Sequence, residues 1–214
     1  SDCTVDDARL VVLNAMQARE KGAQIMTQTR CVSAKREDGL WVIDIENAHG
    51  QFQIKAKVLV NAAGPWVSQF IREDVQIKSP YGIRLIQGSH IIVPKLHDLD
   101  KSFIMQNDDG RIVFAIPYLD KFTMIGTTDR EYAGDPALVA ISEEEIAYLI
   151  KISNEHFKAQ LQREDVVSTF AGVRPLCDDE SDNPAAITRD YTLSLIQDQA
   201  DQAPMLAVFG GKLK

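Results

Sequence analysis

Apolar positions in the first part of the chain recur at helical and then at strand spacing. Residues 6–20 carry an apolar stripe that predicts an amphipathic helix. Thr4 and Asp7 have the spacing of a capping box at its start, and Gly22 has the backbone freedom to end it. A strand is then predicted at residues 23–27, because short apolar runs between turn residues favour extended backbone.

From about residue 30 the apolar pattern changes to strict alternation. Residues 31–34 predict a second strand, and turn pairs at 38–39 and 47–50 separate two further alternating runs. Strands joined by such short turns pair with their neighbours in antiparallel fashion. The stretch 30–57 is therefore predicted to be a small antiparallel meander.

Residues 57–64 form an apolar run without alternation. Such a run is typical of a strand that is buried on both faces in a parallel sheet. The run ends at Gly64, followed by a proline. A glycine at the carboxyl end of a parallel strand could let the backbone approach a ligand, or it could only supply the dihedral angles of a tight turn. The spacing leaves both interpretations open.

The rest of the chain alternates at strand spacing and contains one further helix. Strands are predicted at residues 82–86, 90–93, 102–105, 111–116 and 123–126. Ser142 and Glu145 form a capping-box pair that begins a helix of about sixteen residues. A hairpin is predicted between residues 186 and 209. A sheet followed by a helix that covers it is an α+β layer.

Composition narrows the class of protein. The 214 residues are 45% hydrophobic and 25% charged, values that exclude a disordered chain. With 23 Lys plus Arg against 31 Asp plus Glu, the net charge of −8 argues against a nucleic-acid partner. No apolar stretch approaches the length of a membrane span, and the three cysteines show no disulfide or metal-ligand spacing. We therefore expect a soluble, cytoplasmic protein without a metal site.

Two arginines are candidates for binding an anion. Arg174 lies in A-G-V-R-P, and Arg189 lies fifteen residues later in I-T-R-D-Y, at the other end of one loop. The planar guanidinium group matches a phosphate or a carboxylate. The loop also contains four acidic residues, so pairing of each arginine with a nearby carboxylate is the alternative, Arg174 with Asp178 or Asp179 and Arg189 with Asp190.

Three further segments could carry chemistry. His90 begins an apolar run after Gly-Ser, where it could be a general base or a structural residue. Residues 126–129 read G-T-T-D and could present hydroxyl groups to a ligand or only turn the chain. Gly210, Gly211 and Lys212 have the composition of an anion-binding helix start, but the rest of a phosphate-loop motif is missing.

Seven strings of the sequence together carry a resemblance to a known family. They are T-V-D-D-A-R-L from Thr4, V-N-A-A-G-P-W from Val60, S-P-Y-G-I-R-L-I-Q-G-S-H from Ser79, I-G-T-T-D from Ile125, G-V-R-P-L-C-D-D-E-S-D from Gly172, I-T-R-D-Y from Ile187 and F-G-G-K-L from Phe209. Over essentially its whole length the chain resembles the FAD-dependent glycerol-3-phosphate dehydrogenases, within the wider group of flavoprotein amine and alcohol oxidoreductases.

The resemblance implies a fold and a division into domains. The fold class is α/β plus α+β, with a partial FAD-binding Rossmann-like domain and an inserted antiparallel-sheet substrate-binding domain. Residues 1–72 would be the C-terminal part of the FAD-binding domain, 73–170 the substrate-binding cap, and 171–214 the segment that returns to the FAD domain. The family's dinucleotide fingerprint would precede residue 1. The chain is thus expected to be an internal fragment that alone binds FAD weakly and is inactive.

The resemblance also implies a reaction and residues for its substrate. The family oxidises sn-glycerol 3-phosphate to dihydroxyacetone phosphate, and its respiratory members pass the electrons to quinone, which implies a peripheral membrane position on the cytoplasmic face. Arg174 and Arg189 match arginines near the flavin and the substrate phosphate. His90 matches a substrate-site histidine that helps to deprotonate the alcohol, and Lys212 matches a lysine near flavin and substrate.

The implied cofactor contacts lie elsewhere along the chain. Val32 matches the position whose backbone meets the adenine of FAD, and Gly64 matches a strand end beside the dinucleotide. Gly210 and Gly211 belong, with Lys212, to the glycine-rich segment near the flavin. Two alternatives remain open at this point: a related FAD-dependent amino acid or amine oxidase, and a standalone module that binds phosphate esters.

Overall fold

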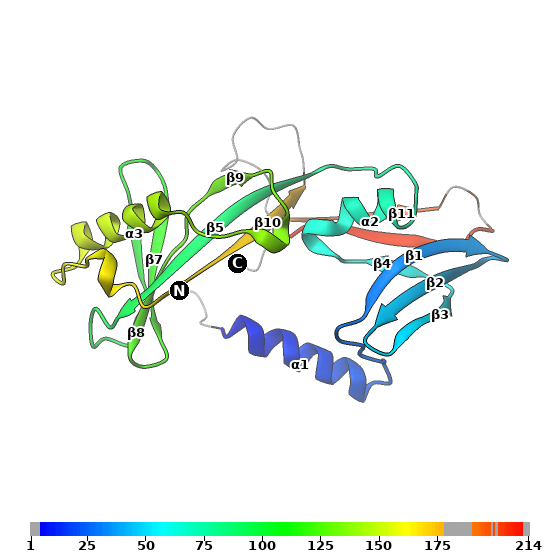
Figure 1. Ribbon diagram of the computed structural model, residues 1–214, viewed down its shortest axis with the longest axis horizontal. Coiled ribbons are helices and arrows are strands. Elements are labelled where there is room, and N and C mark those ends of the chain that lie inside the picture. The colour runs from blue at the N-terminus through cyan, green and yellow to red at the C-terminus, as the bar shows by residue number, and fades with distance from the viewer. Residues whose placement is uncertain (1–4, 178–189, 198, 200, 212–214) are drawn as a thin grey trace. The chain divides into compact units, whose positions relative to one another are not determined.

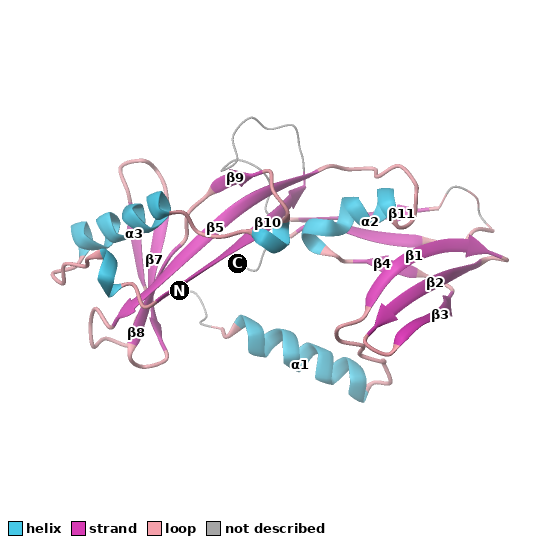
Figure 2. Ribbon diagram, in the orientation of Figure 1, coloured by secondary structure: helices cyan, strands magenta, loops and turns pink. Residues whose placement is uncertain are grey.

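The chain folds into two compact units. The computed structural model describes residues 5–177, 190–197, 199 and 201–211. Internal contacts divide the chain into Ser1–Lys57 and Val58–Lys214, each rich in strands (Figures 1 and 2). Residues 58–72 therefore share a compact unit with the later segments. The division at 72 and 170 remains a prediction about the domains of the family.

The first unit contains one helix and the predicted meander. Its elements are α1 (Asp7–Glu20), β1 (Arg30–Glu37), β2 (Leu40–Asn47) and β3 (Gly50–Ala56). The three strands are antiparallel in the order β1-β2-β3. Asp38 and Gly39 both have positive φ, at 48° and 71°, which is the backbone of the tight two-residue turn that their sequence predicts. The meander is thus confirmed.

Two details of this unit differ from the prediction. The N-cap of α1 is Asp6, whose carboxylate accepts a hydrogen bond from the Arg9 backbone N–H at 3.0 Å, so the capping pair at Thr4 and Asp7 was wrong. Residues 23–27 form no strand and are exposed. A strand needs a neighbour to satisfy its backbone groups, and no described strand pairs with this segment.

The second unit is built around a six-stranded antiparallel sheet. Its strands are β5 (Ile83–Pro94), β6 (Phe103–Gln106), β7 (Ile112–Tyr118), β8 (Phe122–Gly126), β9 (Arg130–Tyr132) and β10 (Ser168–Cys177). They follow the order β10-β5-β8-β7-β6, with β9 beside β5. The separate strands predicted at 82–86 and 90–93 are one continuous strand, because β10 pairs with β5 through Gly88, which lies opposite Gly172.

Helix α3 (Glu143–His156) covers one face of this sheet, as Figure 1 shows. The predicted capping box is present: Ser142 Oγ accepts from the Glu145 backbone, and the Glu145 carboxylate accepts from the Ser142 backbone. The buried core comprises Ile146, Leu149 and Ile152 on α3, with Ile91, Val93, Met105, Val113, Ala115 and Ile125 on the sheet. Ile150 of α3 packs against this core and is partly buried.

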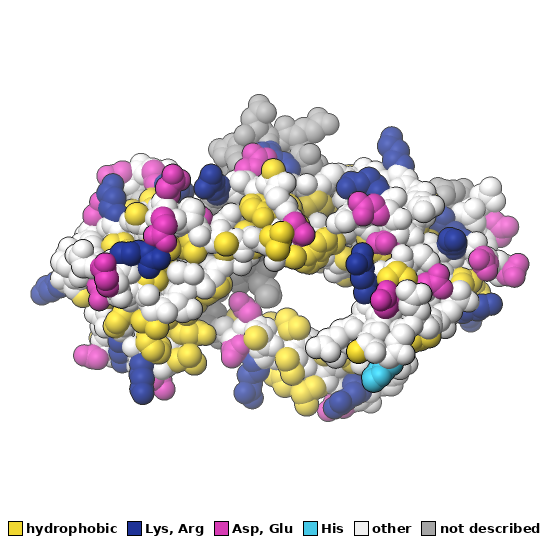
Figure 3. Space-filling model, viewed as in Figure 1, with side chains coloured by type: hydrophobic (Ala, Val, Ile, Leu, Met, Phe, Trp, Pro, Cys, Tyr) yellow, Lys and Arg dark blue, Asp and Glu magenta, His cyan; other side chains and the backbone are white. Residues whose placement is uncertain are grey.

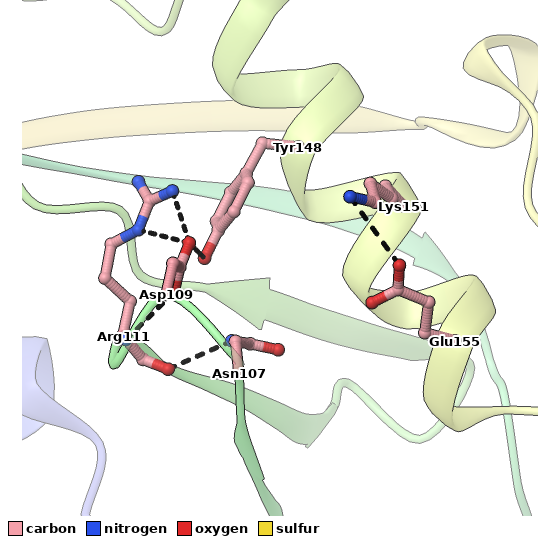
Figure 4. Close-up of polar contacts among 6 residues, drawn as sticks. All are labelled: Asn107, Asp109, Arg111, Tyr148, Lys151 and Glu155. Atoms are coloured by element: carbon pink, nitrogen blue, oxygen red, sulfur yellow. Dashed lines mark hydrogen bonds and ion pairs between the residues drawn. The ribbon is translucent and has the colours of Figure 1, made fainter.

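The outer side of α3 is charged. Lys151 pairs with Glu155 at 3.7 Å on the helix surface, and Figure 3 shows side chains of both signs interspersed over this end of the unit. Asp109 and Arg111, at the turn between β6 and β7, reach Tyr148 on the helix (Figure 4). The guanidinium lies 4.0 Å from the ring centroid, and the Tyr148 hydroxyl donates to the Asp109 carboxylate at 3.2 Å. The hairpin is thereby tied to α3.

A three-stranded sheet completes the second unit. It consists of β4 (Leu59–Asn61), β11 (Tyr191–Ile196) and β12 (Met205–Gly210), with η1 (Gly64–Trp66) and α2 (Val67–Glu73) after β4; η2 (Pro136–Leu138) and η3 (Arg163–Asp165) flank α3. β11 and β12 form the predicted hairpin, and β4 is parallel to β12. No helix in the described ranges is long and apolar enough to cross a bilayer.

The environment of β4 differs from the prediction of burial on both faces. β4 is an edge strand of the described sheet, and Val60 is 58% exposed. The opposite side of this sheet is covered, since Met205, Ala207 and Phe209 of β12 are fully buried or nearly so and α2 contacts β12. An unbroken apolar run thus identified the strand and its parallel pairing, but burial also requires a second covering layer.

Candidate functional site

The face of the six-stranded sheet opposite α3 carries two of the predicted site residues, His90 and Arg174. In the register, His90 of β5 lies opposite Gly126 of β8 and Phe170 of β10. Directly opposed residues point to the same side of a sheet, and side chains alternate along a strand. His90 therefore points away from α3, whereas its neighbours Ser89 and Ile91 are buried toward the helix side.

The His90 imidazole is held in an apolar environment. It stacks on the Phe170 ring with centroids 4.6 Å apart and an interplanar angle of 7°. Its Nδ1 is buried and has no hydrogen-bond partner among the described residues. Burial, with a smaller contribution from the positive charge of Arg174, lowers the pKa of His90 to about 4. The imidazole is consequently neutral at pH 7 and can accept a proton.

Arg174 of β10 is held by the loop that follows β8. Its guanidinium forms an ion pair with Asp129 and donates a hydrogen bond to Thr127 Oγ1 at 2.8 Å. Asp178 and Asp179, the pairing partners considered from the sequence, lie outside the described residues. Sequence reasoning missed Asp129 as a partner. The polar G-T-T-D string at 126–129, directly after a buried strand, marked this loop as a candidate segment but did not identify the partner of Asp129.

Two glycines make room for these side chains. A Cβ atom on Gly126 would lie 2.2 Å from His90 Cδ2, and one on Gly88 would lie 2.4 Å from Arg174 Nη2. Both distances are far shorter than any ordinary contact of a Cβ atom. The His90 and Arg174 side chains and the two glycines therefore form one arrangement, although β5, β8 and β10 are far apart in the sequence.

A second group of predicted residues lies where β4 and β12 end. These two strands are parallel, so their carboxyl ends meet at one edge of the small sheet. Gly64, Gly210 and Gly211 have φ of 55°, 70° and 91°. A Cβ on Gly210 would come within 3.2 Å of the Cys177 backbone nitrogen, which places this edge beside the end of β10 that carries Arg174. The structure thus brings the glycine edge close to Arg174.

Three predicted site residues remain to be placed, Val32, Arg189 and Lys212. Val32 belongs to the first unit, where the register of β1 against β2 shifts between Cys31 and Ser33 and leaves Val32 as an extra residue. Such a bulged residue is not paired in the ladder. Arg189 and Lys212 lie outside the described residues.

The pKa of His90 gives a direct test of this environment. Because the folded-state value of about 4 lies below the ordinary 6.5, the folded protein binds fewer protons between these values than the unfolded chain does. We expect the His90 C2–H resonance to titrate near pH 4 in NMR spectra of the chain, and folding stability to decline as pH falls from 6.5 toward 4. His90→Phe identifies the resonance and should reduce this decline. A midpoint at or above 6.5 would contradict the described burial.

Comparison with known proteins identifies the family. Residues 1–194 match the FAD dependent oxidoreductase family. The chain is 67% identical over 214 residues to a glycerol-3-phosphate dehydrogenase of Pseudomonas aeruginosa and 49% identical over 215 residues to a D-erythritol 1-phosphate dehydrogenase of Brucella abortus. All of the chain is covered in both comparisons, but it spans only 42% of the length of each relative.

A solved structure supports the same assignment. The glycerol-3-phosphate dehydrogenase from Bacillus halodurans, complexed with FAD, aligns with 98% of this chain and 40% of its own chain, with a TM-score of 0.80 and 29% identity. This likeness confirms the predicted mixed fold class. Because the family match extends over most of the sequence, the chain belongs to the FAD-dependent oxidoreductases.

Proposed function

We propose that this chain is part of an FAD-dependent dehydrogenase that oxidises sn-glycerol 3-phosphate to dihydroxyacetone phosphate. The observation that carries the proposal is the 67% identity, over all 214 residues, to a glycerol-3-phosphate dehydrogenase. A neutral histidine and an arginine on the same sheet face are proposed to provide the chemistry that such a substrate requires. The proposal refers to the full-length protein.

Arg174 is the described residue best suited to the substrate phosphate. Its contacts with Asp129 and Thr127 fix the guanidinium group but use only two of its N–H donors. The remaining donors have no partner among the described residues and are proposed to bind phosphate oxygens in the geometry that a guanidinium group favours. Arg189 and Lys212 are proposed to complete the anion site.

His90 is the proposed acceptor of the substrate hydroxyl proton. Its imidazole is neutral at pH 7, because burial and the charge of Arg174 disfavour the protonated form. A phosphate dianion bound at Arg174 would offset that charge and thereby make the imidazole more basic. Removal of the hydroxyl proton helps the adjacent carbon to release a hydride. His90 and Arg174 are therefore proposed to act together.

The residues present are compatible with FAD, which when bound accepts the hydride. The glycine edge formed by Gly64, Gly210 and Gly211 leaves backbone accessible without Cβ atoms, and it adjoins the end of β10 that carries Arg174. The bulge at Val32 leaves a backbone position outside the ladder, as the proposed adenine contact needs. The chain contains no G-x-G-x-x-G motif, so the pyrophosphate contact is not assigned to these residues.

The electron acceptor and the identity of the substrate are two further parts of the proposal. We extend the proposal to electron transfer to quinone at the cytoplasmic membrane surface, on the family resemblance. The 49% identity to a D-erythritol 1-phosphate dehydrogenase makes a longer polyol phosphate the second candidate substrate. An amino acid or amine substrate would instead place a carboxylate at the arginines.

Turnover by the full-length protein tests the proposal. We expect reduction of a quinone analogue with sn-glycerol 3-phosphate at a kcat/KM above that with D-erythritol 1-phosphate, and no turnover of glycine or sarcosine.

Arg189→Ala should raise the KM for the phosphate ester by about tenfold or more, because a charge-assisted hydrogen bond is lost. Preference for an amine substrate would overturn the proposed function, and an unchanged KM would remove Arg189 from the site.

A further inference from the structure

A buried carboxylate lies behind the candidate site. Glu145, in the first turn of α3, is 7% exposed. It accepts hydrogen bonds from Thr128 Oγ1 at 2.6 Å, Ser89 Oγ at 2.8 Å, the Ser142 backbone N–H at 2.9 Å and Gln87 Nε2 at 3.0 Å. All four of these donors are uncharged. Helix capping explains only the bond from Ser142.

The other three donors belong to the two segments that form the site. Gln87 and Ser89 flank Gly88 on β5, and Ser89 directly precedes His90. Thr128 stands between Thr127 and Asp129, the two residues that hold Arg174. The segments are also joined directly, because the Ser89 backbone N–H donates to Thr128 Oγ1 at 3.0 Å. One carboxylate therefore links the strand of His90 to the loop that orients Arg174.

The carboxylate is kept ionised in spite of its burial. Burial by itself would raise the pKa of Glu145, but the hydrogen bonds from Thr128, Ser142 and Ser89 together outweigh it and hold the pKa below its usual value. An apolar side chain could fill the same space against the sheet without this desolvation. A charged acceptor does what an apolar side chain cannot, since it orients several hydroxyl and amide donors at once.

We propose that Glu145 is a positioning residue for the dehydrogenase site, and that its carboxylate fixes the loop 126–129 against residues 87–90 from the helix side of the sheet. Through this link it determines where the His90 imidazole and the Arg174 guanidinium meet the substrate. Glu145 itself points to the face opposite these two side chains and touches neither. The kinetic effects expected from this role of Glu145 rest on the proposed function.

Glu145→Gln in the full-length holoenzyme tests the proposal. The four donors are divided between the two carboxylate oxygens, and glutamine keeps only one of these oxygens as an acceptor. Two of the four donors then face an N–H group, so the link should loosen without loss of side-chain volume. We expect kcat/KM for sn-glycerol 3-phosphate to fall by about tenfold or more, the size of effect of a lost hydrogen bond to a charged group. Thr128→Val removes only the loop side of the link and should have a similar effect. The double variant should be little worse than either single variant, because coupled residues are not additive.

Two controls separate positioning from helix stability. Ser142→Ala removes the cap hydroxyl but leaves the Glu145 carboxylate and its backbone donor; it should lower the unfolding temperature and leave kcat/KM within twofold. Glu143→Gln makes the same chemical change at an exposed neighbour whose partner is Arg163 at 2.8 Å, and it should change neither quantity much. If Ser142→Ala lowers kcat/KM as much as Glu145→Gln does, the positioning role is overturned.

Amide hydrogen exchange provides a readout that does not depend on the substrate. In the Glu145→Gln holoenzyme, peptides covering 87–90 and 126–129 should exchange about tenfold faster, while peptides of β6 and β7 should be unchanged. Equal exchange in variant and wild type would overturn the role of Glu145 whatever the substrate is. A wild-type enzyme inactive on sn-glycerol 3-phosphate would instead refute the proposed function, and the exchange result would still decide the role of Glu145.

Discussion

Replacing Gly126 by alanine is expected to displace the His90 imidazole and to lower kcat/KM of the full-length enzyme by about 100-fold or more, the contribution typical of a general base. The new Cβ would lie 2.2 Å from Cδ2 and 2.8 Å from Nε2 of the His90 ring. The ring has little room to withdraw, because Phe170 stacks on it from the neighbouring strand. Forcing an extra methyl group into packed structure also destabilises a protein, by about 1–3 kcal/mol. Steady-state kinetics and the unfolding temperature measure the two effects.

A matched glycine and a double variant make this prediction specific. Gly172 lies in β10 on the same sheet, and a Cβ there would meet nothing within 4 Å, so Gly172→Ala should leave the unfolding temperature nearly unchanged. In a His90→Ala background the space beside Gly126 is open, and Gly126→Ala should then cause little further loss of stability. Strict additivity of the two changes, or full activity of Gly126→Ala, would show that the contact is not the cause.

Replacing Arg174 by lysine should lower kcat/KM for the phosphate ester roughly 10- to 150-fold, as expected from the loss of about 1.5–3 kcal/mol of hydrogen bonding to a charged group. The guanidinium reaches Asp129 and Thr127 with two different nitrogens and keeps further donors for the substrate. A lysine has a single nitrogen and cannot reproduce this planar arrangement. Kinetics with sn-glycerol 3-phosphate and with glycerol, which has no phosphate, measure the effect.

The comparison between the two substrates identifies the role of Arg174. If Arg174 binds phosphate, Arg174→Lys should reduce the preference for the phosphate ester over glycerol. Arg163→Lys serves as the control, because Arg163 pairs with Glu143 at 2.8 Å near the start of α3, on the side of the sheet opposite His90 and Arg174. An equal loss on both substrates would mean that Arg174 acts on the reaction but not on the phosphate.

Most elements followed from local pattern. The meander, the hairpin of β11 and β12, the parallel pairing of β4 and the capped start of α3 are set by turn residues and by periodicity over a few positions. Two of the errors share a physical origin. Residues 23–27 and the exposed face of β4 depend on layers supplied by other parts of a fold, and a short apolar run does not specify what will cover it.

The candidate site was only partly visible in the sequence. Motif strings pointed to His90 and Arg174, but the I-G-T-T-D string gave no indication that Asp129 would pair with an arginine 45 residues later. Glu145 had the signature of a helix cap and no more. Its links to Ser89 and Thr128 span 56 and 17 residues, and no local rule connects such positions.

Local pattern and family resemblance were therefore sufficient for the types of element, the family and the chemical groups available. The register of β10, β5 and β8 decided how the site residues are arranged in space. It places His90 opposite Gly126, and it places Gly88 beside Arg174. It also sends Gln87 and Ser89 to the helix side, where one carboxylate can hold them. The alternation of side chains is encoded within each strand. Which strands pair, and in which register, depends on packing across the whole unit.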